Sequence, residues 1–556
     1  MIQKIKEGIV KVVKDVLSGY KPAIEEFPVY LEVPSDEKFG DFSLNIAMKL
    51  AKPLRKSPLA IAKDLAEKIR VGLDKENILD KIERIDIKAP GFINFFLKNE
   101  VYHQLLSQIK IEGVNFGRSN SGTAQKVLIE FVSANPTGPL SIAHARQAAV
   151  GDSLAKILGF CGFEVQKEYY VNDEGTQINL LGESLKVRYE ELISKTKLQI
   201  PENGYKGTYL KKMAERLQNS GVPKNAPSSF FSGFAVSEIL KEIKKSLEDF
   251  NVEFDTWHYQ SSLADKIPQV LEELKNNGFI EKKDAAIWLK SCSANLGDDK
   301  DRVLIKSDGT YTYLAPDIAY HKNKFERGFS RLINIWGPDH HGYINRLKAA
   351  VMALGYREDA LSIIIIQLAS LFRDGKPVVM STREGEYITL DELVNEVGKD
   401  ASRFLFLMRK CDSHLEFDLE LAKKETLENP VYYVMYAYAR ILSIQKMKDA
   451  KGKTLDISTA DCTFLKEKEE LDLLKKLSHF PQIIQDCAQD LDSHGMTTYL
   501  RQLAGCFHLF YDKHRVMSSD NKPEVSSARL FLIQGVRQVI ETGLKLLGVS
   551  SSKERM

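Results

Sequence analysis

The sequence predicts an α/β protein whose parallel-sheet core carries a helical insertion, with a small α+β domain before the core and an all-α domain after it. Three observations predict this arrangement. Strand and helix patterns alternate over residues 122–395, which is typical of parallel βαβ units. A charged and mostly helical stretch at about 174–255 interrupts the alternation. From 396 to 556 nearly every segment has helical periodicity.

Length and composition indicate a multidomain protein of ordinary water-soluble character. The chain has 556 residues, of which 43% are hydrophobic and 28% are charged, and its formal net charge is +2. It has no apolar run long enough to cross a bilayer, so we expect no membrane segment. Its 6 cysteines are scattered without a Cys-x-x-Cys pair, which predicts reduced thiols in a cytoplasmic protein rather than disulfides or a zinc site. Any surface that binds nucleic acid must be local, because the net charge is small.

We expect the N-terminal domain over residues 1–112. Apolar residues within 2–16 recur at helical spacing among lysines and glutamates, which predicts an amphipathic helix rather than a secretory signal. Further helix patterns cover 44–51 and 59–69. Two short strands are expected within 85–96, around a Pro-Gly turn.

The core begins with a strand, a tight turn and a helix start in immediate succession. Residues 127–132 are mostly apolar and predict a buried strand, Pro-Thr-Gly-Pro at 136–139 ends it, and helical periodicity begins at Ile142. Unpaired N–H groups and the positive dipole end at such a helix start favour a bound phosphate. Later core strands are expected at 285–289, at 332–336 and, as a buried parallel strand, at the isoleucine run 363–366.

Residues 134–146 read Ala-Asn-Pro-Thr-Gly-Pro-Leu-Ser-Ile-Ala-His-Ala-Arg. This stretch resembles the first signature of class I aminoacyl-tRNA synthetases, and more closely the form found in the arginyl family. Stretches similar to the same family follow in order along nearly the whole chain, beginning at residues 168, 204, 297, 308, 336, 428, 510 and 546. The resemblance implies a Rossmann-type catalytic core, an N-terminal domain that binds the tRNA elbow and a helical anticodon-binding domain.

By this resemblance the substrate arginine is bound by Glu130, Asn135, Tyr313 and Asp317. The residue types suit the task, because a guanidinium is a planar, permanently charged fork of donors that requires carboxylates around it. Tyr313 and Asp317 are four residues apart and would share one face of a helix. Taken alone, Asp317 is equally well explained as a helix cap or a surface acid. A polar pocket of this kind rejects analogues by roughly 10⁴–10⁵-fold, which agrees with the lack of an apparent editing domain.

The resemblance also implies an ATP site that uses Mg²⁺ with the nucleotide and no metal bound by the protein itself. Its residues would be Pro136, Thr137, Gly138, His144, Gly337, Asp339, His340, Met380 and Ser381. His144, Ser141 and Arg383 would act in catalysis. Because fixed positive charge lowers the barrier to attack on the α-phosphate, loss of the Arg383 charge should slow adenylate formation at least about tenfold. The alternative for Arg383 is a solvated loop cation.

Four positions depart from the two family signatures. Ser141 and Ala143 replace a histidine and a glycine of the first, and Val379 and Thr382 replace two lysines of the second. Ser141 keeps a hydroxyl but loses the reach of an imidazole, and Ala143 adds a methyl group where adenine approaches the backbone. We therefore expect a weaker or slower ATP site that Ser141→His would improve.

Recognition of tRNA is expected from residues of the C-terminal helices: Tyr432, Tyr436, Arg440, Tyr511 and the terminal Met556. Aromatic rings stack on unpaired bases and cations contact phosphates. The alternative is strong, because tyrosines at helical spacing are more often core residues. Met435 and Tyr438 also depart from the family pattern.

Together these expectations describe an arginine–tRNA(Arg) ligation that uses ATP and passes through arginyl-adenylate. The family is usually monomeric and requires tRNA for the first step, and the reaction needs positioning and electrostatics rather than a protein nucleophile. Two alternatives stay open: a catalytically weakened tRNA-binding paralogue, and a class I synthetase for another amino acid. The intact arginine-pocket residues argue against both.

Overall fold

The structure, a computed structural model, describes residues 2–20, 28–34, 36–223, 225–378, 387–447, 457, 460–518 and 520–551. The chain forms two compact units, each assembled from segments that are distant in the sequence. One unit comprises residues 1–117, 437–483 and 502–542. The other comprises 118–436, 484–501 and 543–556 and contains the whole of the cavity described below.

The first unit begins with the predicted amphipathic helix, α1 (Ile2–Ser18), whose apolar face includes the buried Ile9 and Val13. A three-stranded antiparallel sheet follows in the order β1-β3-β2, and the predicted Pro-Gly turn joins β2 to β3. The elements of this part are β1 (Phe42–Leu44), α2 (Ile46–Leu54), α3 (Pro58–Lys75), β2 (Ile82–Lys88), β3 (Phe92–Leu97) and α4 (Asn99–Glu112). These elements confirm the predicted helices and the predicted strand pair.

Helical segments from the C-terminal part of the chain complete the first unit. α16 (Lys468–Ser478) packs on α4, and the ring of Phe116 stacks on that of Phe480 with centroids 6.1 Å apart. The buried Glu470 of α16 accepts a hydrogen bond of 2.7 Å from Arg529. The unit therefore joins the α+β segment to part of the helical C-terminal region.

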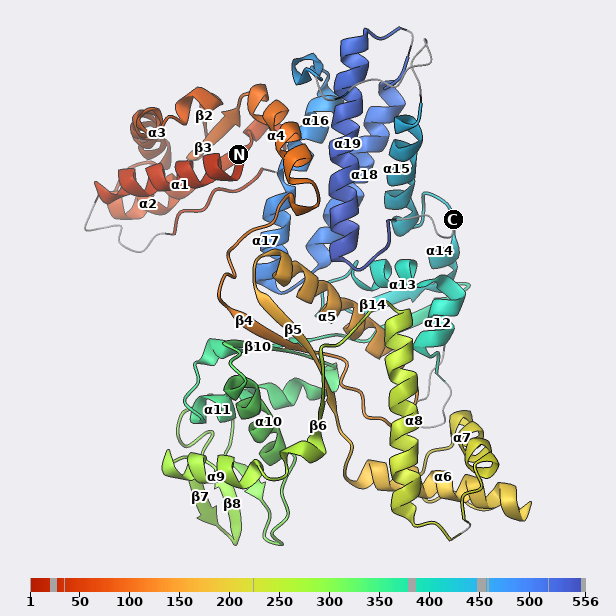
Figure 1. Ribbon diagram of the computed structural model, residues 1–556. Helices are drawn as coiled ribbons and strands as arrows, with labels where there is room; N and C mark the ends of the chain where they lie inside the picture. The colour runs from red at the N-terminus through yellow and green to blue at the C-terminus, as the bar shows by residue number, and fades with distance from the viewer. Residues whose placement is uncertain are drawn as a thin grey trace. The chain divides into compact units, whose positions relative to one another are not determined.

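The second unit is built on a five-stranded parallel sheet in the order β11-β10-β4-β5-β6 (Figure 1). Its strands are β4 (Lys126–Glu130), β5 (Glu164–Val171), β6 (Thr256–Tyr259), β10 (Arg331–Trp336) and β11 (Leu361–Ile365). The strand order reverses between β4 and β10, and open α/β sheets bind ligands in the crevice at the carboxyl ends of the strands at this point. The predicted Rossmann-type core is confirmed.

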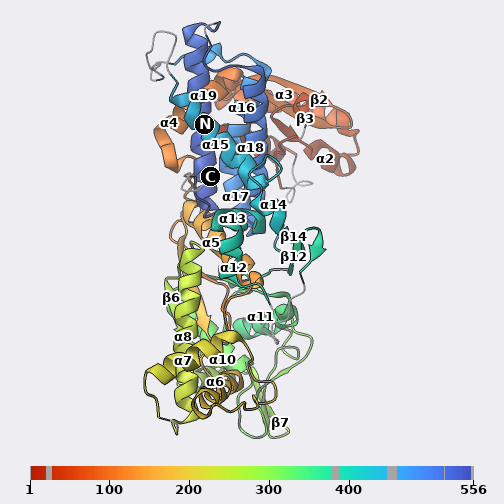
Figure 2. The same cartoon turned by 90° about the vertical axis from the view of Figure 1, so that its right-hand side faces the viewer.

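The helices of the core follow the predicted pattern. α5 (Ile142–Phe160) leads from β4 to β5 and packs against both strands. The predicted insertion between β5 and β6 contains α6 (Thr176–Ser194), α7 (Thr208–Asn219) and α8 (Ser228–Asp249). α6 packs on both α7 and α8, and the three helices lie together in both views (Figures 1 and 2).

The strand predicted at residues 285–289 exists, but it does not belong to the parallel sheet. β8 (Ala286–Leu289) is the central strand of an antiparallel sheet with β7 (Ile280–Lys283) and β9 (Arg302–Ile305). Asp284 and Ala285, which join β7 to β8, have φ angles of 51° and 56°. A two-residue turn of this hand connects antiparallel neighbours, so the expectation of a core strand there was wrong.

Two further strands differ from the sequence prediction. The isoleucine run forms β11, which is parallel as predicted, but β11 lies at the edge of the sheet and is mostly half-buried. The region after residue 396 contains β14 (Leu415–Asp418), which pairs in parallel with β12 (Ala369–Arg373). β14 alternates buried and exposed residues, a period of two that the helical interpretation overlooked. β13 (Lys376–Pro377) completes this small sheet.

Further helices of the chain are α9 (Ile267–Asn276), α10 (Leu314–Glu326), α11 (Ile344–Ala353), α12 (Leu390–Val397), α13 (Lys399–Phe406), α14 (Leu419–Lys423), α15 (Pro430–Gln445), α17 (Phe480–Asp490), α18 (His494–Lys513) and α19 (Pro523–Leu546). α15 begins at Pro430 as predicted. Among the described residues, no helix has both the length and the apolar character that a membrane span requires. All 6 cysteines are free thiols.

Candidate active site

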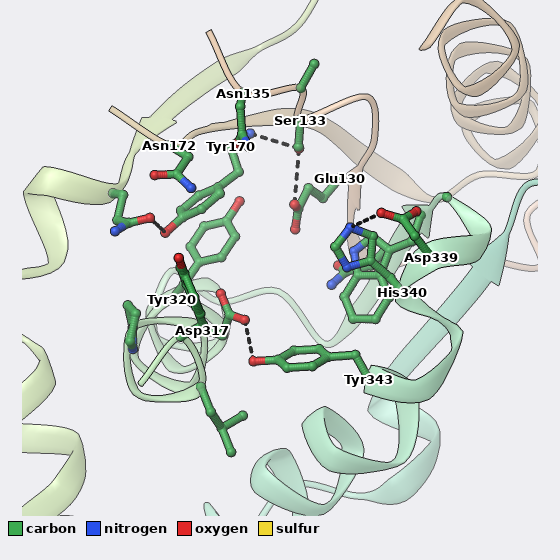
Figure 3. Close-up of a pocket in the computed structure, with 18 of the residues that line it drawn as sticks. Glu130, Ser133, Asn135, Tyr170, Asn172, Asp317, Tyr320, Asp339, His340 and Tyr343 are labelled. Carbon is green, nitrogen blue, oxygen red and sulfur yellow. Dashed lines mark hydrogen bonds and ion pairs between the residues drawn. The ribbon is translucent and has the colours of Figure 1, made fainter. Parts of the chain in front are cut away.

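A cavity of about 890 Å³ opens at the carboxyl ends of β4 and β10, where the strand order reverses (Figure 3). Side chains from both strands, from the first turns of α5 and α10 and from the segment after β10 line it. Of the residues predicted from the sequence, eight take part in this lining: Glu130, Asn135, His144, Tyr313, Asp317, Gly337, Asp339 and His340.

The two predicted acids face this one cavity from different elements. Glu130 ends β4 and is 6% exposed, whereas Asp317 lies in the first turn of α10. Asp317 accepts a hydrogen bond of 2.6 Å from the hydroxyl of Tyr343 (Figure 3). Burial raises the pKa of Asp317 to about 7, against the hydrogen bond from Tyr343 and with a contribution from Glu130. Asp317 is therefore a half-buried acid of the cavity with a raised pKa, not a surface carboxylate.

Glu130 already holds two partners. Its Oε2 accepts a hydrogen bond of 2.5 Å from the ammonium group of Lys324, and its Oε1 accepts one of 3.1 Å from the hydroxyl of Ser133. Lys324 is 0% exposed, and its Nζ lies 4.1 Å from the centroid of the Tyr320 ring. A buried ammonium requires such a carboxylate, because an unpaired charge in the protein interior is costly.

A chain of hydrogen bonds links Lys324 to the backbone of Asp317. Lys324 donates to Oδ1 of Asn334 at 3.3 Å, and the Asn334 amide donates to Nε2 of His321 at 2.8 Å. Nδ1 of His321 then donates to the carbonyl of Asp317 at 2.8 Å. Burial and the nearby Lys324 hold the pKa of His321 well below its ordinary value. The ring is thus neutral, as a ring that both accepts and donates must be.

A second buried ion pair lies behind the cavity lining and is connected to it through Tyr320, which lines the cavity. Glu168 of β5 is 0% exposed and accepts hydrogen bonds of 2.6 and 2.9 Å from Arg327 and one of 2.7 Å from Tyr320. Burial acts to raise the pKa of Glu168, but the bonds from Arg327 and the nearby Lys324 outweigh it and leave the pKa lowered. α10 and its C-terminal end supply most of these groups: Asp317, Tyr320, His321, Lys324 and Arg327.

Asn135 and Tyr313 line the cavity nearer to solvent. Tyr313 immediately precedes α10 and is 80% exposed, so its side chain lies at the rim. Asn135 is exposed as well, and its amide donates a hydrogen bond of 2.8 Å to Gln177 of α6. The structure therefore separates the four predicted arginine residues into a buried acid, Glu130, a half-buried acid, Asp317, and two rim groups.

On the other side of the cavity, α5 begins where the sequence predicted. Ser141 is the residue before the helix, and Nδ1 of His144 accepts a hydrogen bond of 3.1 Å from the backbone N–H of Ser141. Burial lowers the pKa of His144 to about 4, against the opposing effect of Asp339. Since Nδ1 accepts, the neutral ring carries its proton on Nε2. His144 can thus offer an anion a hydrogen bond, but not a positive charge.

Part of the predicted phosphate turn does not reach the cavity. Four predicted residues of this region are not in its lining: Pro136, Thr137, Gly138 and Ser141. The turn is instead fixed through its backbone. The carbonyl of Thr137 accepts a hydrogen bond of 2.5 Å from Tyr209 of α7, and the carbonyl of Pro139 accepts one of 2.9 Å from Tyr387.

The segment after β10 completes the cavity on this side. A Cβ atom at Gly337 would lie 2.6 Å from Oδ1 of Asp339, so a side chain there would displace that carboxylate. Asp339 and His340 lie 3.3 Å apart, with side chains 76% and 57% exposed. Over the described parts of the chain, no three His, Cys, Asp or Glu side chains are grouped to hold a metal ion.

The residues predicted to contact tRNA form two pairs. The rings of Tyr432 and Tyr436, both in α15, stack with centroids 6.0 Å apart. In the other unit, the guanidinium of Arg440 lies 4.8 Å from the centroid of the Tyr511 ring. Four predicted site residues lie outside the described residues: Met380, Ser381, Arg383 and Met556.

Seven residues that were not predicted complete the acidic wall, the group formed by Glu130, Asp317 and the side chains around them. Four of these line the cavity, namely Tyr320, His321, Asn334 and Tyr343, and three lie behind the lining, namely Glu168, Lys324 and Arg327. One signal was available. Polar residues at positions 317, 320, 321 and 324 recur at the spacing of one helix face, which is unusual for a helix against a buried sheet. Asn334 and Tyr343 come from other elements and had no local signal.

Three family models match successive parts of the chain. The arginyl tRNA synthetase N terminal domain matches residues 3–97, and the class I (R) tRNA synthetase catalytic domain matches 105–415. The DALR anticodon binding domain matches residues 434–556. Together these matches cover most of the chain in the order that the resemblance implied.

Curated relatives and a solved structure agree with these matches. The arginine–tRNA ligase of Geobacter sp. (strain M21) is 45% identical over 547 residues, 97% of this chain and 96% of the relative. That of Desulforamulus reducens is 43% identical over 570 residues, 100% of this chain and 99% of the relative. The Thermus thermophilus arginyl-tRNA synthetase structure covers 99% of both chains with a TM-score of 0.76 at 19% identity, which shows a shared fold. The chain belongs to the arginyl-tRNA synthetase family of class I.

Proposed function

We propose that the protein is an arginine–tRNA ligase that works in two steps. Arginine and ATP give arginyl-adenylate and pyrophosphate, and the 3′-terminal adenosine of tRNA(Arg) then takes the arginyl group as AMP leaves. One observation carries this proposal: Glu130 and Asp317 face a single cavity that also receives the N-terminus of α5. Paired acids beside an anion-binding helix start suit a substrate with a guanidinium at one end and a reacting carboxylate at the other.

The proposed arginine site consists of Glu130, Asn135, Tyr313 and Asp317. The guanidinium would lie between the two acids, where its planar donors meet acceptors that are already held in place. Asn135 and Tyr313, which lie nearer to solvent, would orient the amino and carboxyl groups of the substrate. Because the buried network fixes the acids beforehand, little binding free energy is lost to rearrangement.

The proposed nucleotide site combines the start of α5 with the segment after β10. We assign to it four residues that line the cavity: His144, Gly337, Asp339 and His340. On the sequence alone we add Pro136, Thr137, Gly138, Met380 and Ser381. The neutral His144 would donate its Nε2 hydrogen bond to a phosphate, and Ser141 positions that ring through its backbone N–H. We further propose that Arg383 stabilises the charge that develops during attack on the α-phosphate. The roles of Met380, Ser381 and Arg383 rest on the sequence alone.

Mg²⁺ is expected to arrive with ATP. It would neutralise the charge that develops on the leaving pyrophosphate. The exposed carboxylate of Asp339, which lies close enough to His144 to influence its pKa, suits one ligand position of an ion held mostly by phosphates and water.

We propose a division of labour along the chain: 1–112 for the tRNA elbow, 122–395 for catalysis, with its insertion at about 174–255, and 396–556 for the anticodon. Tyr432, Tyr436, Arg440, Tyr511 and Met556 are the proposed tRNA contacts. Rings paired with rings or with a guanidinium, as in these two pairs, suit contact with bases and phosphates. We propose a cytoplasmic monomer, as its free thiols and lack of a heptad seam suggest.

The test is ATP–pyrophosphate exchange by the full chain with arginine, in the presence and absence of tRNA(Arg), beside lysine and glutamine. We expect exchange with arginine that requires tRNA, followed by formation of arginyl-tRNA. Binding of tRNA without any exchange would instead establish the catalytically weakened paralogue, which the intact acidic wall disfavours. Exchange with another amino acid would refute the proposed specificity.

A further inference from the structure

Lys324 is a buried cation behind the arginine pocket. It does not line the cavity itself but contacts Glu130, which does, and neither reaction step uses it. Its side chain is 0% exposed, and its Nζ contacts Oε2 of Glu130 at 2.5 Å and Oδ1 of Asn334 at 3.3 Å. A pocket that selects a cation would at first sight exclude a cation of its own. The presence of Lys324 on the very carboxylate expected to bind the guanidinium therefore requires a reason.

Two acids beside the expected guanidinium position already have cations as partners. Glu130 pairs with Lys324, and Glu168 pairs with Arg327. Asp317 instead accepts its hydrogen bond from a hydroxyl, that of Tyr343. Arg302, which also lines the cavity, is bound by Asp298 and Asp299. A second lining arginine, Arg346, lies 4.9 Å from the centroid of the Tyr343 ring. Of Glu130, Glu168 and Asp317, it is Asp317 that has no cation among the described residues as a hydrogen-bond partner, so the substrate guanidinium would supply one there.

Lys324 also fixes the direction of the Glu130 carboxylate. Both oxygens are held, Oε2 by Lys324 and Oε1 by Ser133, so the remaining lone pairs point in set directions. A carboxylate oxygen can accept more than one hydrogen bond. Glu130 is therefore an oriented acceptor whose charge is already compensated, and a substrate must match its geometry rather than merely supply a charge.

We propose that Lys324 is a positioning residue that makes the pocket select arginine by shape: it compensates and orients Glu130, so that only a planar fork can satisfy Glu130 and Asp317 together. The proposal rests on the proposed function and deepens it. An ammonium substrate such as lysine is a compact point charge and cannot bridge two fixed acceptors as a guanidinium does. With Lys324 removed, Glu130 regains an uncompensated charge that attracts any cation.

The test compares Lys324→Met with the unchanged chain by measuring kcat/KM for arginine and for lysine in tRNA-dependent exchange. We expect the ratio of kcat/KM for arginine to kcat/KM for lysine to fall at least about tenfold, because attraction by charge replaces selection by geometry. KM for ATP should stay the same. If Lys324 were only a structural ion pair, both values would fall together and the ratio would not move. That outcome would overturn the proposal.

Two further variants protect the test against a folding defect. The double variant Lys324→Met with Glu130→Gln leaves no lone buried charge. Compared with Glu130→Gln alone, it should change kcat/KM for arginine less than about threefold, because Lys324 acts through Glu130. Full additivity of the two substitutions would contradict the proposal. Lys324→Arg, which keeps the cation, should retain most of the selectivity.

The matched control is Lys322→Met, on the same helix. Like Lys324, Lys322 does not line the cavity, but its partners Glu273 and Glu326 do not line it either, whereas Glu130 does. It should leave the ratio of arginine to lysine unchanged. If the unchanged chain fails to use arginine, the proposed function is wrong. If the unchanged chain uses arginine but Lys324→Met has the same ratio of kcat/KM for arginine to that for lysine, only the role of Lys324 is refuted.

Discussion

The two sides of the cavity are built on different physical principles. On the arginine side the charged groups behind the lining are buried and paired: Lys324 and Glu168 are 0% exposed, Lys324 binds Glu130 and Arg327 binds Glu168. The nucleotide side presents the start of α5, a neutral histidine and the side chains of Asp339 and His340, which are 76% and 57% exposed. Selection of a small cation needs acceptors that cannot move, whereas phosphate binding needs donors that many anions could use.

This difference predicts unequal effects of substitution. A charge in a buried network interacts strongly and is costly to leave unpaired. An exposed charge is screened by water and salt. Changes on the arginine side should therefore be large and specific for the amino acid, and changes on the nucleotide side should be smaller and affect ATP.

The largest effect is expected from Asp317→Asn. This substitution removes the acid that would meet the guanidinium charge, and loss of one member of a buried charge pair should lower kcat/KM for arginine about 10³-fold. KM for ATP should stay within about twofold of its value in the unchanged chain, as measured by exchange kinetics. Asp359→Asn, at an exposed acid that pairs with Arg357, is the control. An equal loss for both substrates would show that the two sides are not separate.

The next largest effect is a pH dependence of KM for arginine that KM for ATP does not share. Asp317 is ionised only above its pKa of about 7, and a guanidinium favours the ionised form, so KM for arginine should rise about tenfold per unit as the pH falls below 7. The titratable groups close enough to interact electrostatically with Asp317 are Glu130 of β4, Tyr170 of β5, Lys324 of α10 and Tyr343.

KM for ATP, measured over the same range, should not follow this trend, because the pKa of His144 is about 4 and its ring stays neutral between pH 6 and 8. Asp317→Asn should abolish the pH dependence of KM for arginine. Parallel profiles for the two substrates would contradict the assignment of Asp317.

On the nucleotide side, Arg383→Gln should slow adenylate formation at least about tenfold. The reason is the loss of positive charge during attack on the α-phosphate. Single-turnover formation of arginyl-adenylate is the measurement, and Arg357→Gln, at an exposed arginine, is the control. An unchanged rate would leave Arg383 as a solvated cation of its loop.

The smallest effect is expected from Ser141→His. An added imidazole near the helix start would supply about one further hydrogen bond, which corresponds to an improvement of KM for ATP of roughly threefold. Since Ser141 does not line the cavity, a larger gain is not expected. If KM for ATP does not improve, the altered signature does not weaken the site.

Local patterns allowed much of the fold to be predicted. The 3.6-residue spacing within α1 and the apolar run of β4 followed by Pro-Thr-Gly-Pro identified elements that the structure contains. Predictions failed where pairing between distant segments decided the outcome. β8 looked like a core strand, but a two-residue turn gave it an antiparallel neighbour, and β14 was too short to stand out among helices.

For the candidate site, the sequence identified Glu130 and Asp317 through the family resemblance, and the structure showed that both line one cavity. The sequence did not reveal that Lys324 donates a hydrogen bond to one oxygen of Glu130 or that Tyr343 donates one to Asp317. Nor did it reveal that Tyr209 and Tyr387 hold the phosphate turn. These partners come from different elements, so no spacing along the chain encodes them.

The sequence by itself determined the periodic elements, the domain order and the family of this protein, because helix spacing, turn residues and signature motifs are properties of short stretches. Only the tertiary structure decided which charges are buried together and which remain exposed. The reason is that the strength of an ionic interaction depends on the surrounding dielectric, and that surrounding is formed by strands and helices that meet only when the chain has folded.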